Sequence, residues 1–310
     1  MTVPARVTIV EVGPRDGLQD RPSVPGTAGK VAFIDRLSDA GLPVIEVGAF
    51  VDPRRVPAMA DSEAVARAIK QRPGTRYTAL VPNLRGLARA VDAGLREVSV
   101  FGAASESFSR RNINHGIAES FNTFRGVIRE AGAAGVRVRA YLSTAFGCPY
   151  EGDVAASRVA ELADELLQMG AFEVAISDTI GVAHPGQVWR VLDEVAARVP
   201  LERIALHFHD TRGTALANVL AGLQAGVVTF DASCGGLGGC PYAPGASGNL
   251  ATEDLVYMLD GLGIDTGVSL TGLVEASAVI GPHVGGELPS RYLRASQAAP
   301  RIHQNDHRDA

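Results

Sequence analysis

Short apolar runs alternate with longer stretches of helical period along most of the chain. Each run is four to seven residues long and contains few polar positions. Runs of this length and composition are typical of β-strands that are buried on both faces. We therefore expect strands at residues 7–12, 44–47, 77–81, 98–101, 136–142, 172–176, 204–208 and 227–230.

The stretches between these runs show the spacing of amphipathic helices. Several of them stop at a glycine, as at Gly41, Gly94, Gly170 and Gly226. Glycine favours the end of a helix because it adopts the left-handed backbone conformation without a steric penalty. The expected helices span residues 30–40, 62–70, 84–93, 118–134, 155–169, 186–198 and 214–225.

This alternation predicts an α/β fold, a (β/α)8 TIM barrel. Continuously apolar strands separated by helices indicate a parallel sheet with right-handed crossovers. Eight strands suffice to close a barrel, whereas open doubly wound sheets usually have fewer. We expect an extra C-terminal helical region at residues 263–280. The predicted catalytic domain spans residues 1–285, helical extension included, and residues 286–310 are predicted to form an irregular tail.

The composition disfavours several classes of protein. The 310 residues carry a net charge of −5 and show no cluster of Lys and Arg, which argues against nucleic-acid and membrane-surface binding. Neither a secretory signal nor a membrane-spanning run is evident. Three cysteines are too few for a disulfide framework. We therefore expect a cytoplasmic protein without nucleic-acid or membrane partners.

Reactive residues lie near or just after the carboxyl ends of the predicted strands. In a TIM barrel the active site lies at the carboxyl ends of the strands, so these side chains are expected to meet. The candidates are Arg15, Asp16, Glu46, Tyr141, Asp178, His207 and His209, followed by Cys240 and Asn249 in the loop after the last strand.

His207 and His209 form the most informative pair. Alternation along a strand places both imidazoles on one face. Taken alone, such a pair is more often a pair of hydrogen-bonded core histidines than a metal site. Asp16 at the same barrel mouth and Asn249 after a glycine-rich loop favour a metal. Two imidazoles, a carboxylate and an amide suit Mg²⁺ or Mn²⁺ better than a closed structural zinc site.

Two other features each have two interpretations. Arg15 either forms a surface ion pair with Asp16 or directs its guanidinium at a developing enolate or a carboxylate. The glycine-rich segment 235–248 is either a flexible connection or a mobile lid that delivers Cys240. Its glycines do not match a dinucleotide-binding motif, and it follows the last strand instead of the first.

The chain resembles the 3-hydroxy-3-methylglutaryl-CoA lyases, a family of metal-dependent barrel lyases. The likeness extends to about residue 280, and its Gly-Cys-Pro loop is typical of lyases in this superfamily and not of its condensing enzymes. The matching segments are 11–19 (EVGPRDGLQ), 112–114 (NIN), 147–152 (GCPYEG), 178–182 (DTIGV), 236–242 (GLGGCPY) and 245–259 (GASGNLATEDLVYML).

The resemblance implies an activity and a cofactor. The expected reaction is the cleavage of (S)-3-hydroxy-3-methylglutaryl-CoA to acetyl-CoA and acetoacetate, with Mg²⁺ or Mn²⁺ as the divalent metal and leucine breakdown as the pathway. The substrate partner is an acyl-CoA. We also expect a homo-oligomer, a dimer or a tetramer.

The resemblance also implies residue roles. Asp16, His207, His209 and Asn249 would hold the metal, and Asp16 or His207 would accept the proton of the substrate hydroxyl. Arg15 would polarise the thioester carbonyl and stabilise the enolate, while Cys240 would act in proton transfer. Glu46 would support these groups. Tyr141 and Asp178 would bind near the substrate hydroxyl, which makes them, with Arg15, the predicted substrate-binding residues.

Some positions depart from the family pattern. Gly48 and Ala49 stand where the family more often has Thr and Ser, and Ser177 replaces a usual Gly. The small pair predicts a larger acyl pocket. Rival functions are a lyase for another 3-hydroxy-3-alkylglutaryl-CoA and an aldolase for a 4-hydroxy-2-oxo acid. A barrel that has lost catalysis and serves as a binding subunit is disfavoured, because the candidate set is intact.

Overall fold

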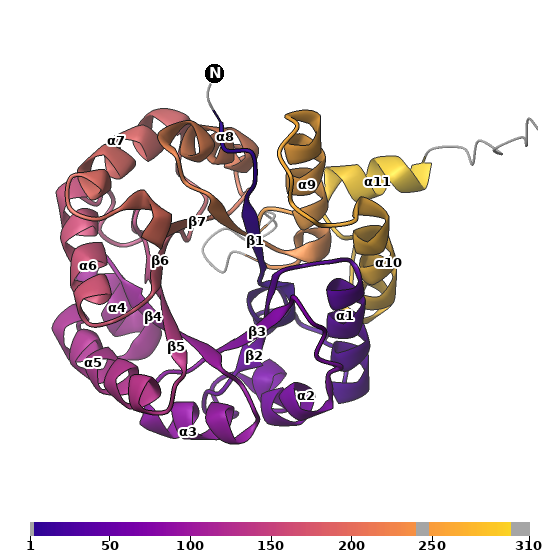
Figure 1. The fold of residues 1–310 in the computed structure, drawn as a ribbon, viewed down its shortest axis with the longest axis horizontal. Helices are drawn as coiled ribbons and strands as arrows, with labels where there is room; N and C mark the ends of the chain where they lie inside the picture. The colour runs from indigo at the N-terminus through magenta and orange to yellow at the C-terminus, as the bar shows by residue number, and fades with distance from the viewer. Residues whose placement is uncertain (1–2, 240–247, 299–310) are drawn as a thin grey trace, which may run out of the picture.

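Eight parallel strands close a barrel in the order in which they occur along the chain (Figure 1). The computed structural model describes residues 3–239 and 248–298. The predicted α/β TIM barrel is confirmed. The strands are β1 (Thr8–Glu11), β2 (Val44–Ala49), β3 (Arg76–Leu80), β4 (Glu97–Ala103), β5 (Arg137–Ser143), β6 (Glu173–Asp178), β7 (Ile204–Phe208) and β8 (Thr229–Ala232).

The barrel closes between β1 and β8. Thr8 pairs with Thr229 and Glu11 with Ala232, so the first and last strands lie side by side in parallel register. Nearly every strand residue is buried, because side chains on one face fill the barrel and those on the other pack under the helices. This burial on both faces explains the continuous apolar runs in the sequence.

A ring of helices covers the barrel (Figure 1). Their apolar residues recur at helical spacing, as in α5, where Phe121, Phe124 and Ile128 are buried. Asn83 caps α3 by accepting a hydrogen bond from the backbone N–H of Gly86 (3.0 Å). The ring comprises α1 (Thr27–Asp39), α2 (Ser62–Ala68), α3 (Leu84–Asp92), α4 (Glu106–Ile113), α5 (Ile117–Ala133), α6 (Ala156–Gln168), α7 (Pro185–Ala196), α8 (Ala215–Ala225) and α9 (Thr252–Gly261).

Helix α4 was not predicted, because it is short, polar and only slightly buried. Within it, Phe108 and Ser109 are the buried residues. The hydroxyl of Ser105 accepts a hydrogen bond from the backbone N–H of Phe108 (3.2 Å) and caps the helix. A local cap and one buried aromatic residue therefore specify this helix, and neither produces an amphipathic period. Helix α9 was also not predicted as a separate element.

The predicted extra helical region is present as α10 (Leu270–Ile280), which packs against α1. Gly272 allows this contact, since a Cβ there would lie 2.8 Å from the Cβ of Ala40. The predicted start at residue 263 is too early. Gly263 and Gly267 adopt positive φ angles of 72° and 68°, which helices do not accommodate.

The prediction of an irregular tail from residue 286 is wrong for α11 (Arg291–Ala298). The carboxylate of Asp254 in α9 accepts hydrogen bonds from the backbone N–H groups of Arg291 (3.0 Å) and Tyr292 (2.8 Å). The hydroxyl of Ser290 also donates to this carboxylate (2.7 Å). A side chain far away in the sequence thus anchors the first turn of α11, which local composition cannot reveal. Residues 299–310 of the predicted tail lie outside the described residues.

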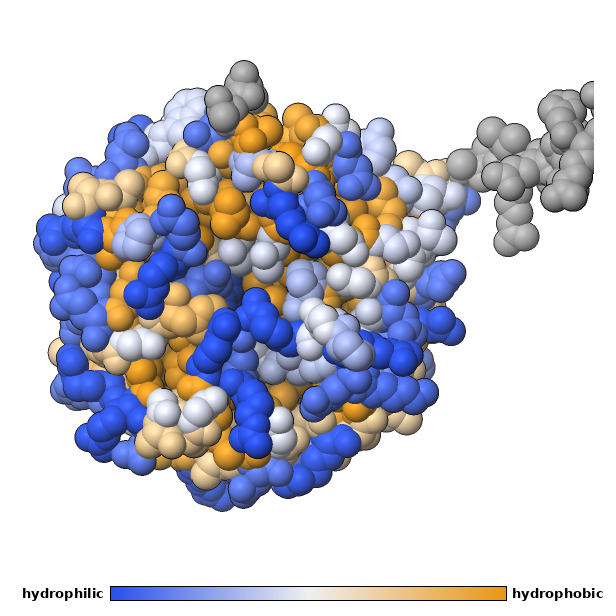
Figure 2. Space-filling model, in the orientation of Figure 1, coloured by the Kyte–Doolittle hydropathy of each residue, from blue (hydrophilic) through white to orange (hydrophobic). Residues whose placement is uncertain are grey.

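Figure 2 shows one face of the molecule, on which hydrophilic residues lie over much of the helical ring and hydrophobic residues show between them. Trp189 and Tyr257 are the most exposed aromatic residues described, at 46% and 62%. Among the described residues, no helix has both the length and the apolar character that crossing a membrane requires.

Candidate active site

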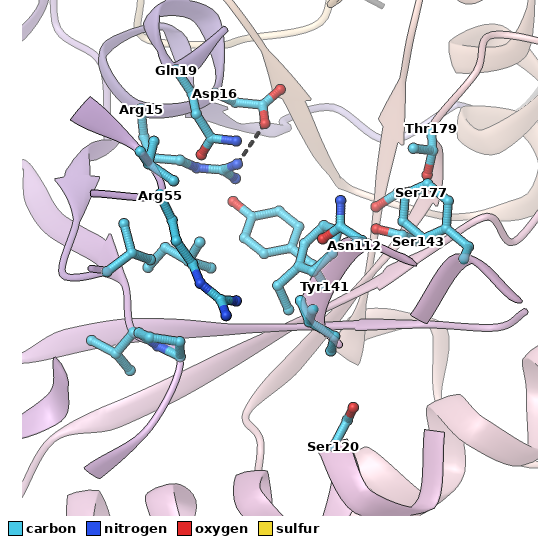
Figure 3. Close-up of a pocket in the computed structure, with 18 of the residues that line it drawn as sticks. Arg15, Asp16, Gln19, Arg55, Asn112, Ser120, Tyr141, Ser143, Ser177 and Thr179 are labelled. Carbon is cyan, nitrogen blue, oxygen red and sulfur yellow. Dashed lines mark hydrogen bonds and ion pairs between the residues drawn. The ribbon is translucent and has the colours of Figure 1, made fainter. Parts of the chain in front are cut away.

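A cavity of about 710 Å³ opens among residues at the carboxyl ends of the strands. Figure 3 shows Arg15, Asp16 and Gln19 together on one side of it and Ser143, Ser177 and Thr179 on the other. The side chains of Phe101, Phe108 and Phe124 contribute apolar surface. The cavity therefore combines a polar end, where the predicted reactive residues meet, with an apolar remainder.

The turn after β1 positions Arg15 and Asp16. Residues Gly13–Gly17 form a single π-helical turn, in which the carbonyl of Val12 accepts hydrogen bonds from the N–H groups of Arg15 (3.2 Å) and Gly17 (3.1 Å). Position 17 requires glycine, because a Cβ there would lie 2.8 Å from the side chain of Leu237. The turn consequently brings two consecutive charged residues to the barrel mouth.

Arg15 is buried and held by two carboxylates. Its Nε donates to Oε2 of Glu46 (2.6 Å), and its Nη1 donates to Oδ1 of Asp16 (2.5 Å; Figure 3). Burial lowers the pKa of Arg15, but the charges of Glu46 and Asp16 raise it by more, so the guanidinium stays charged. This arrangement differs from the surface ion pair that was the simpler interpretation of the sequence.

Glu46 supports Arg15 from inside the barrel. It is fully buried and accepts hydrogen bonds from the hydroxyl groups of Ser99 (2.5 Å) and Tyr141 (3.1 Å), in addition to the bond from Arg15. The guanidinium carbon of Arg15 lies 5.1 Å from the centre of the Tyr141 ring. Tyr141 lines the cavity, whereas Glu46 does not.

Asp16, His207 and His209 converge as the sequence predicts. One oxygen or nitrogen from each lies within 4.8 Å of the others. Burial raises the pKa of Asp16, but Arg15 and the two imidazoles lower it by more, to about 2. Burial and the neighbouring His207 lower the pKa of His209 to about 4. At neutral pH the cluster thus offers a carboxylate and a neutral imidazole, the forms that bind metal ions.

Backbone pairing brings Asn249 to the same cluster. The backbone of residues 208–210 runs antiparallel to that of residues 248–250, with hydrogen bonds from Asp210 N–H to the carbonyl of Gly248 (2.8 Å) and from Leu250 N–H to that of Phe208 (3.1 Å). Asn249 then donates from Nδ2 to Oδ2 of Asp16 (2.9 Å). All four predicted metal ligands are therefore neighbours.

The donor set fits a hard or borderline divalent cation. Among the described residues, Nδ1 of His209 and Oδ1 of Asn249 are buried and have no hydrogen-bond partner. Buried polar atoms are nearly always paired, so two unpaired ones beside a carboxylate indicate a ligand. Oxygen and imidazole donors without a thiolate suit Mg²⁺ or Mn²⁺.

A second buried cluster, which sequence reasoning missed, lies against His207. Nδ1 of His207 is 3.2 Å from Oδ2 of Asp231. Arg139 donates to both oxygens of Asp231 (3.1 and 2.7 Å) and to Glu173 (2.6 Å). Burial raises the pKa of Asp231, but Arg139 lowers it by more, and the net shift is downward. A charged residue within an apolar strand was the available signal, since a buried Arg139 requires a carboxylate partner.

Asp178 does not line the described cavity, although its neighbours Ser177 and Thr179 do. Its carboxylate accepts hydrogen bonds from the backbone N–H groups of Val182 and Ala183 (3.0 Å each). Burial raises its pKa to about 6 despite these bonds. The structure therefore shows Asp178 holding the loop after β6, and its contact with a substrate stays a prediction.

The expectation that Gly48 and Ala49 enlarge the pocket is wrong for the described residues. Neither of them lines the cavity. A Cβ at position 48 would lie 2.5 Å from Oγ of Ser62, so this hydroxyl fills the space that a larger side chain would need. The same hydroxyl accepts a hydrogen bond from the N–H of Ala49 (3.1 Å). Cys240 lies outside the described residues.

Comparison with known proteins gives a consistent result. The HMGL-like family matches residues 6–280. The mitochondrial hydroxymethylglutaryl-CoA lyase of Rattus norvegicus is 54% identical over 95% of this chain and 91% of that protein. The hydroxymethylglutaryl-CoA lyase structure from Pseudomonas aeruginosa has a TM-score of 0.94 at 51% identity, covering 96% and 99% of the two chains. An HMG-CoA lyase from Acinetobacter baumannii, in complex with coenzyme A and 3-methylmalate, has a TM-score of 0.88 at 37% identity, covering 98% of each chain.

Proposed function

The chain belongs to the HMGL-like family, and on that basis we propose that it is a carbon–carbon lyase that cleaves (S)-3-hydroxy-3-methylglutaryl-CoA to acetyl-CoA and acetoacetate. The observation that carries the proposal is the convergence of Asp16, His207 and His209, with one donor atom of each within 4.8 Å of the others, at the wall of a cavity. Relatives named hydroxymethylglutaryl-CoA lyase match nearly the whole chain, so the similarity is not confined to the barrel framework.

We propose that Asp16, His207, His209 and Asn249 hold the divalent cation, Mg²⁺ or Mn²⁺. Support comes from the unpaired, buried Oδ1 of Asn249 and Nδ1 of His209. When bound, such a cation supplies Lewis-acid stabilisation of negative charge on nearby substrate oxygens. The binding of a metal at this place also offsets the cost of burying the carboxylate and the two imidazoles.

In the proposed reaction, Asp16 accepts the proton of the substrate's tertiary hydroxyl group, or His207 does when its imidazole is not bound to the cation. The bond between C2 and C3 then breaks. C3 becomes the ketone of acetoacetate, and the electron pair moves to the thioester as the enolate of acetyl-CoA. Asp16 and His207 line the cavity and are close enough to each other to serve one substrate oxygen.

Arg15 is the proposed partner of the enolate oxygen. Its guanidinium lines the cavity and stays charged because Glu46 and Asp16 flank it. A fixed cation aimed at developing negative charge lowers the barrier without reorganising in the transition state. Tyr141 donates a hydrogen bond from its hydroxyl to Glu46, and its ring limits the movement of the Arg15 guanidinium. We propose that Cys240 or a histidine returns a proton to the enolate carbon.

The decisive assay uses metal-free protein that is supplied with Mg²⁺ or Mn²⁺. Acetyl-CoA and acetoacetate should appear in equal amounts from hydroxymethylglutaryl-CoA, and chelation should stop their formation. Parallel reactions contain a longer 3-hydroxy-3-alkylglutaryl-CoA and a 4-hydroxy-2-oxo acid. Faster cleavage of the longer thioester would replace the proposed substrate, and release of pyruvate from the oxo acid alone would refute the proposed reaction.

We further propose that the protein is a homo-oligomer, a dimer or a tetramer, that acts in the cytoplasm in leucine breakdown. Two of its three cysteines, Cys148 and Cys234, are buried free thiols, which fits a reducing compartment. Light scattering of the purified protein gives the subunit number directly. A monomeric mass at micromolar concentration would contradict the oligomer.

A further inference from the structure

We propose that Asp231 is a positioning residue that fixes both the tautomer and the orientation of His207, so that Nε2 of this imidazole is available to the cation. This inference rests on the proposed metal site and assigns a task to Asp231, which forms a buried cluster with Arg139 and Glu173. We call these three residues the interior cluster.

The strand register places the two side chains together. His207 in β7 and Asp231 in β8 are paired positions on adjacent parallel strands, so their side chains lie on the same face of the sheet. The imidazole nitrogen Nδ1 lies 3.2 Å from Oδ2 of Asp231. The exposed fractions of the two side chains are 8% and 0%, so water does not compete effectively for this contact.

Arg139 determines which partner carries the hydrogen. Its Nη1 and Nη2 donate to Oδ2 and Oδ1 of Asp231, at 3.1 and 2.7 Å, and its Nε donates to Glu173 at 2.6 Å. A carboxylate that receives two hydrogen bonds from a guanidinium is charged and acts purely as an acceptor. The hydrogen in the contact with Asp231 must therefore sit on Nδ1 of His207, which leaves the lone pair of Nε2 free.

The Tyr141 ring restricts the alternative orientation. It meets the His207 ring edge-on, with 6.3 Å between ring centres and an angle of 86°. Among the described residues, His209 has no comparable support, since its Nδ1 is buried without a partner. One imidazole of the pair is thus oriented before any cation arrives, whereas the other is oriented by the cation or by its neighbours.

Asp231→Asn tests the tautomer, because asparagine has the same shape and cannot act as a pure acceptor. With its amide nitrogen toward His207, it donates to Nδ1 and moves the imidazole hydrogen to Nε2. With its amide nitrogen toward Nη2 of Arg139, two donors oppose each other. Loss of such a supporting carboxylate typically weakens metal affinity roughly 10–100-fold.

The experiment measures Mn²⁺ binding to metal-free protein by electron paramagnetic resonance and the tautomer of His207 by ¹⁵N NMR at about pH 8, above the ordinary histidine pKa. The spectrum of His207→Gln assigns the signal. We expect Nδ1–H in the wild-type protein and roughly 10–100-fold weaker Mn²⁺ binding in Asp231→Asn, with hydrogen shifted toward Nε2.

Glu173→Gln is the matched control. It makes the same carboxylate-to-amide change and also contacts Arg139, but the structure shows no bond from it to His207 among the described residues. Its Mn²⁺ affinity should stay within about threefold of the wild-type value. An equal loss in Glu173→Gln and Asp231→Asn would overturn the inference, because the effect would then reflect general damage to the buried charges.

Two further outcomes separate this inference from the proposed function. An Nε2–H tautomer in the wild-type protein, or unchanged Mn²⁺ affinity in Asp231→Asn, overturns the positioning role and leaves the metal site intact. No Mn²⁺ binding by the wild-type protein overturns the metal site, while the wild-type tautomer still tests the role of Asp231. The wild-type spectrum decides this point even if Asp231→Asn fails to fold.

Discussion

Two buried polar clusters lie next to each other in the barrel, and they differ in how completely their atoms are paired. In the interior cluster (Arg139, Glu173 and Asp231), hydrogen bonds pair the guanidinium with both carboxylates. In the mouth cluster (Asp16, His207, His209 and Asn249), two buried atoms have no partner among the described residues, namely Nδ1 of His209 and Oδ1 of Asn249.

This difference distinguishes a supporting cluster from a binding site. A polar atom that is buried without a hydrogen-bond partner destabilises the folded protein. Such atoms therefore occur mainly where a bound ligand supplies the missing partner or where function requires them. The interior cluster is satisfied by protein atoms alone and has no need of a ligand. Mutations in the mouth cluster should therefore affect activity far more than stability, and mutations of Asp231 or Arg139 in the interior cluster should affect both.

The largest expected effect is that of His209→Ala on activity. Removing one ligand weakens cation binding, and the lost Lewis-acid stabilisation of several kcal/mol corresponds to a fall of about 10³-fold in kcat/KM at limiting metal. The free energy of unfolding of the metal-free protein should change by about 1 kcal/mol or less, because the imidazole has an unpaired nitrogen. Steady-state kinetics and urea denaturation measure the two effects.

His184→Ala is the control for this prediction, since His184 is exposed at the N-terminus of α7 and makes no capping hydrogen bond. It should leave both quantities unchanged. A loss of stability in His209→Ala that matched its loss of activity would show that His209 is a structural histidine, and the contrast between the clusters would disappear.

Arg139→Met should have the largest effect on stability. It leaves the carboxylates of Asp231 and Glu173 in the barrel without their counter-charge, which typically costs about 3–5 kcal/mol of unfolding free energy. Urea denaturation measures this loss. Arg125→Met removes an exposed ion pair with Glu165 and should cost less than about 1 kcal/mol. Equal losses in the two variants would contradict the importance of burial.

Glu11 is a third type of buried carboxylate, paired with N–H and O–H donors instead of a guanidinium. It accepts hydrogen bonds from the backbone of Gly13 and Cys234 (2.8 Å each) and from the hydroxyl of Thr252 (2.6 Å). Burial raises its pKa from 4.5 to about 7, although these bonds lower it. Partners without a positive charge thus leave the burial cost partly uncompensated.

This raised pKa predicts a dependence of stability on pH. Below about pH 4.5, Glu11 is protonated in both states and contributes no difference. As the pH rises to about 7, the unfolded chain loses the proton and the folded protein keeps it, so the free energy of unfolding falls by about 3 kcal/mol. Above that pH the loss is constant. In urea denaturation between about pH 5 and 8, Glu11→Gln should remove the part of this slope that Glu11 contributes, while the part from Asp178, whose pKa is also raised, remains. An unchanged slope would refute the assignment.

Glu46→Gln should have the smallest of these effects. Three donors converge on the carboxylate, from Arg15, Ser99 and Tyr141, and an amide nitrogen cannot accept any of them. The resulting displacement of Arg15 should lower kcat by about 10²-fold, with little change in Mn²⁺ affinity. Glu97→Gln makes the same change at the opposite end of the barrel, beside Arg76, and should leave kcat unchanged. Equal rates in the two variants would argue against a catalytic role for Arg15.

Much of the site can be predicted from the sequence, because the alternation of side chains along a strand depends only on neighbouring residues. Once β7 is recognised, alternation places His207 and His209 on one face, and the barrel rule brings Asp16 to the same end. Asp178 shows the limit of this reasoning. It ends a strand as expected, but its carboxylate bonds to the loop that follows, and that loop conformation is not encoded in a strand pattern.

The sequence by itself determined the eight-stranded barrel, the family resemblance and the residues that meet at the mouth, since burial on both faces and helical spacing leave regular patterns along the chain. Tertiary structure decided which polar groups are paired, namely Arg139 with Asp231 and Asp254 with the first turn of α11. It also decided that the Ser62 side chain fills the space beside Gly48. The physical reason is that hydrogen bonds and close packing require segments far apart in the sequence to be placed to within a few tenths of an ångström. Residue periodicity carries no such information.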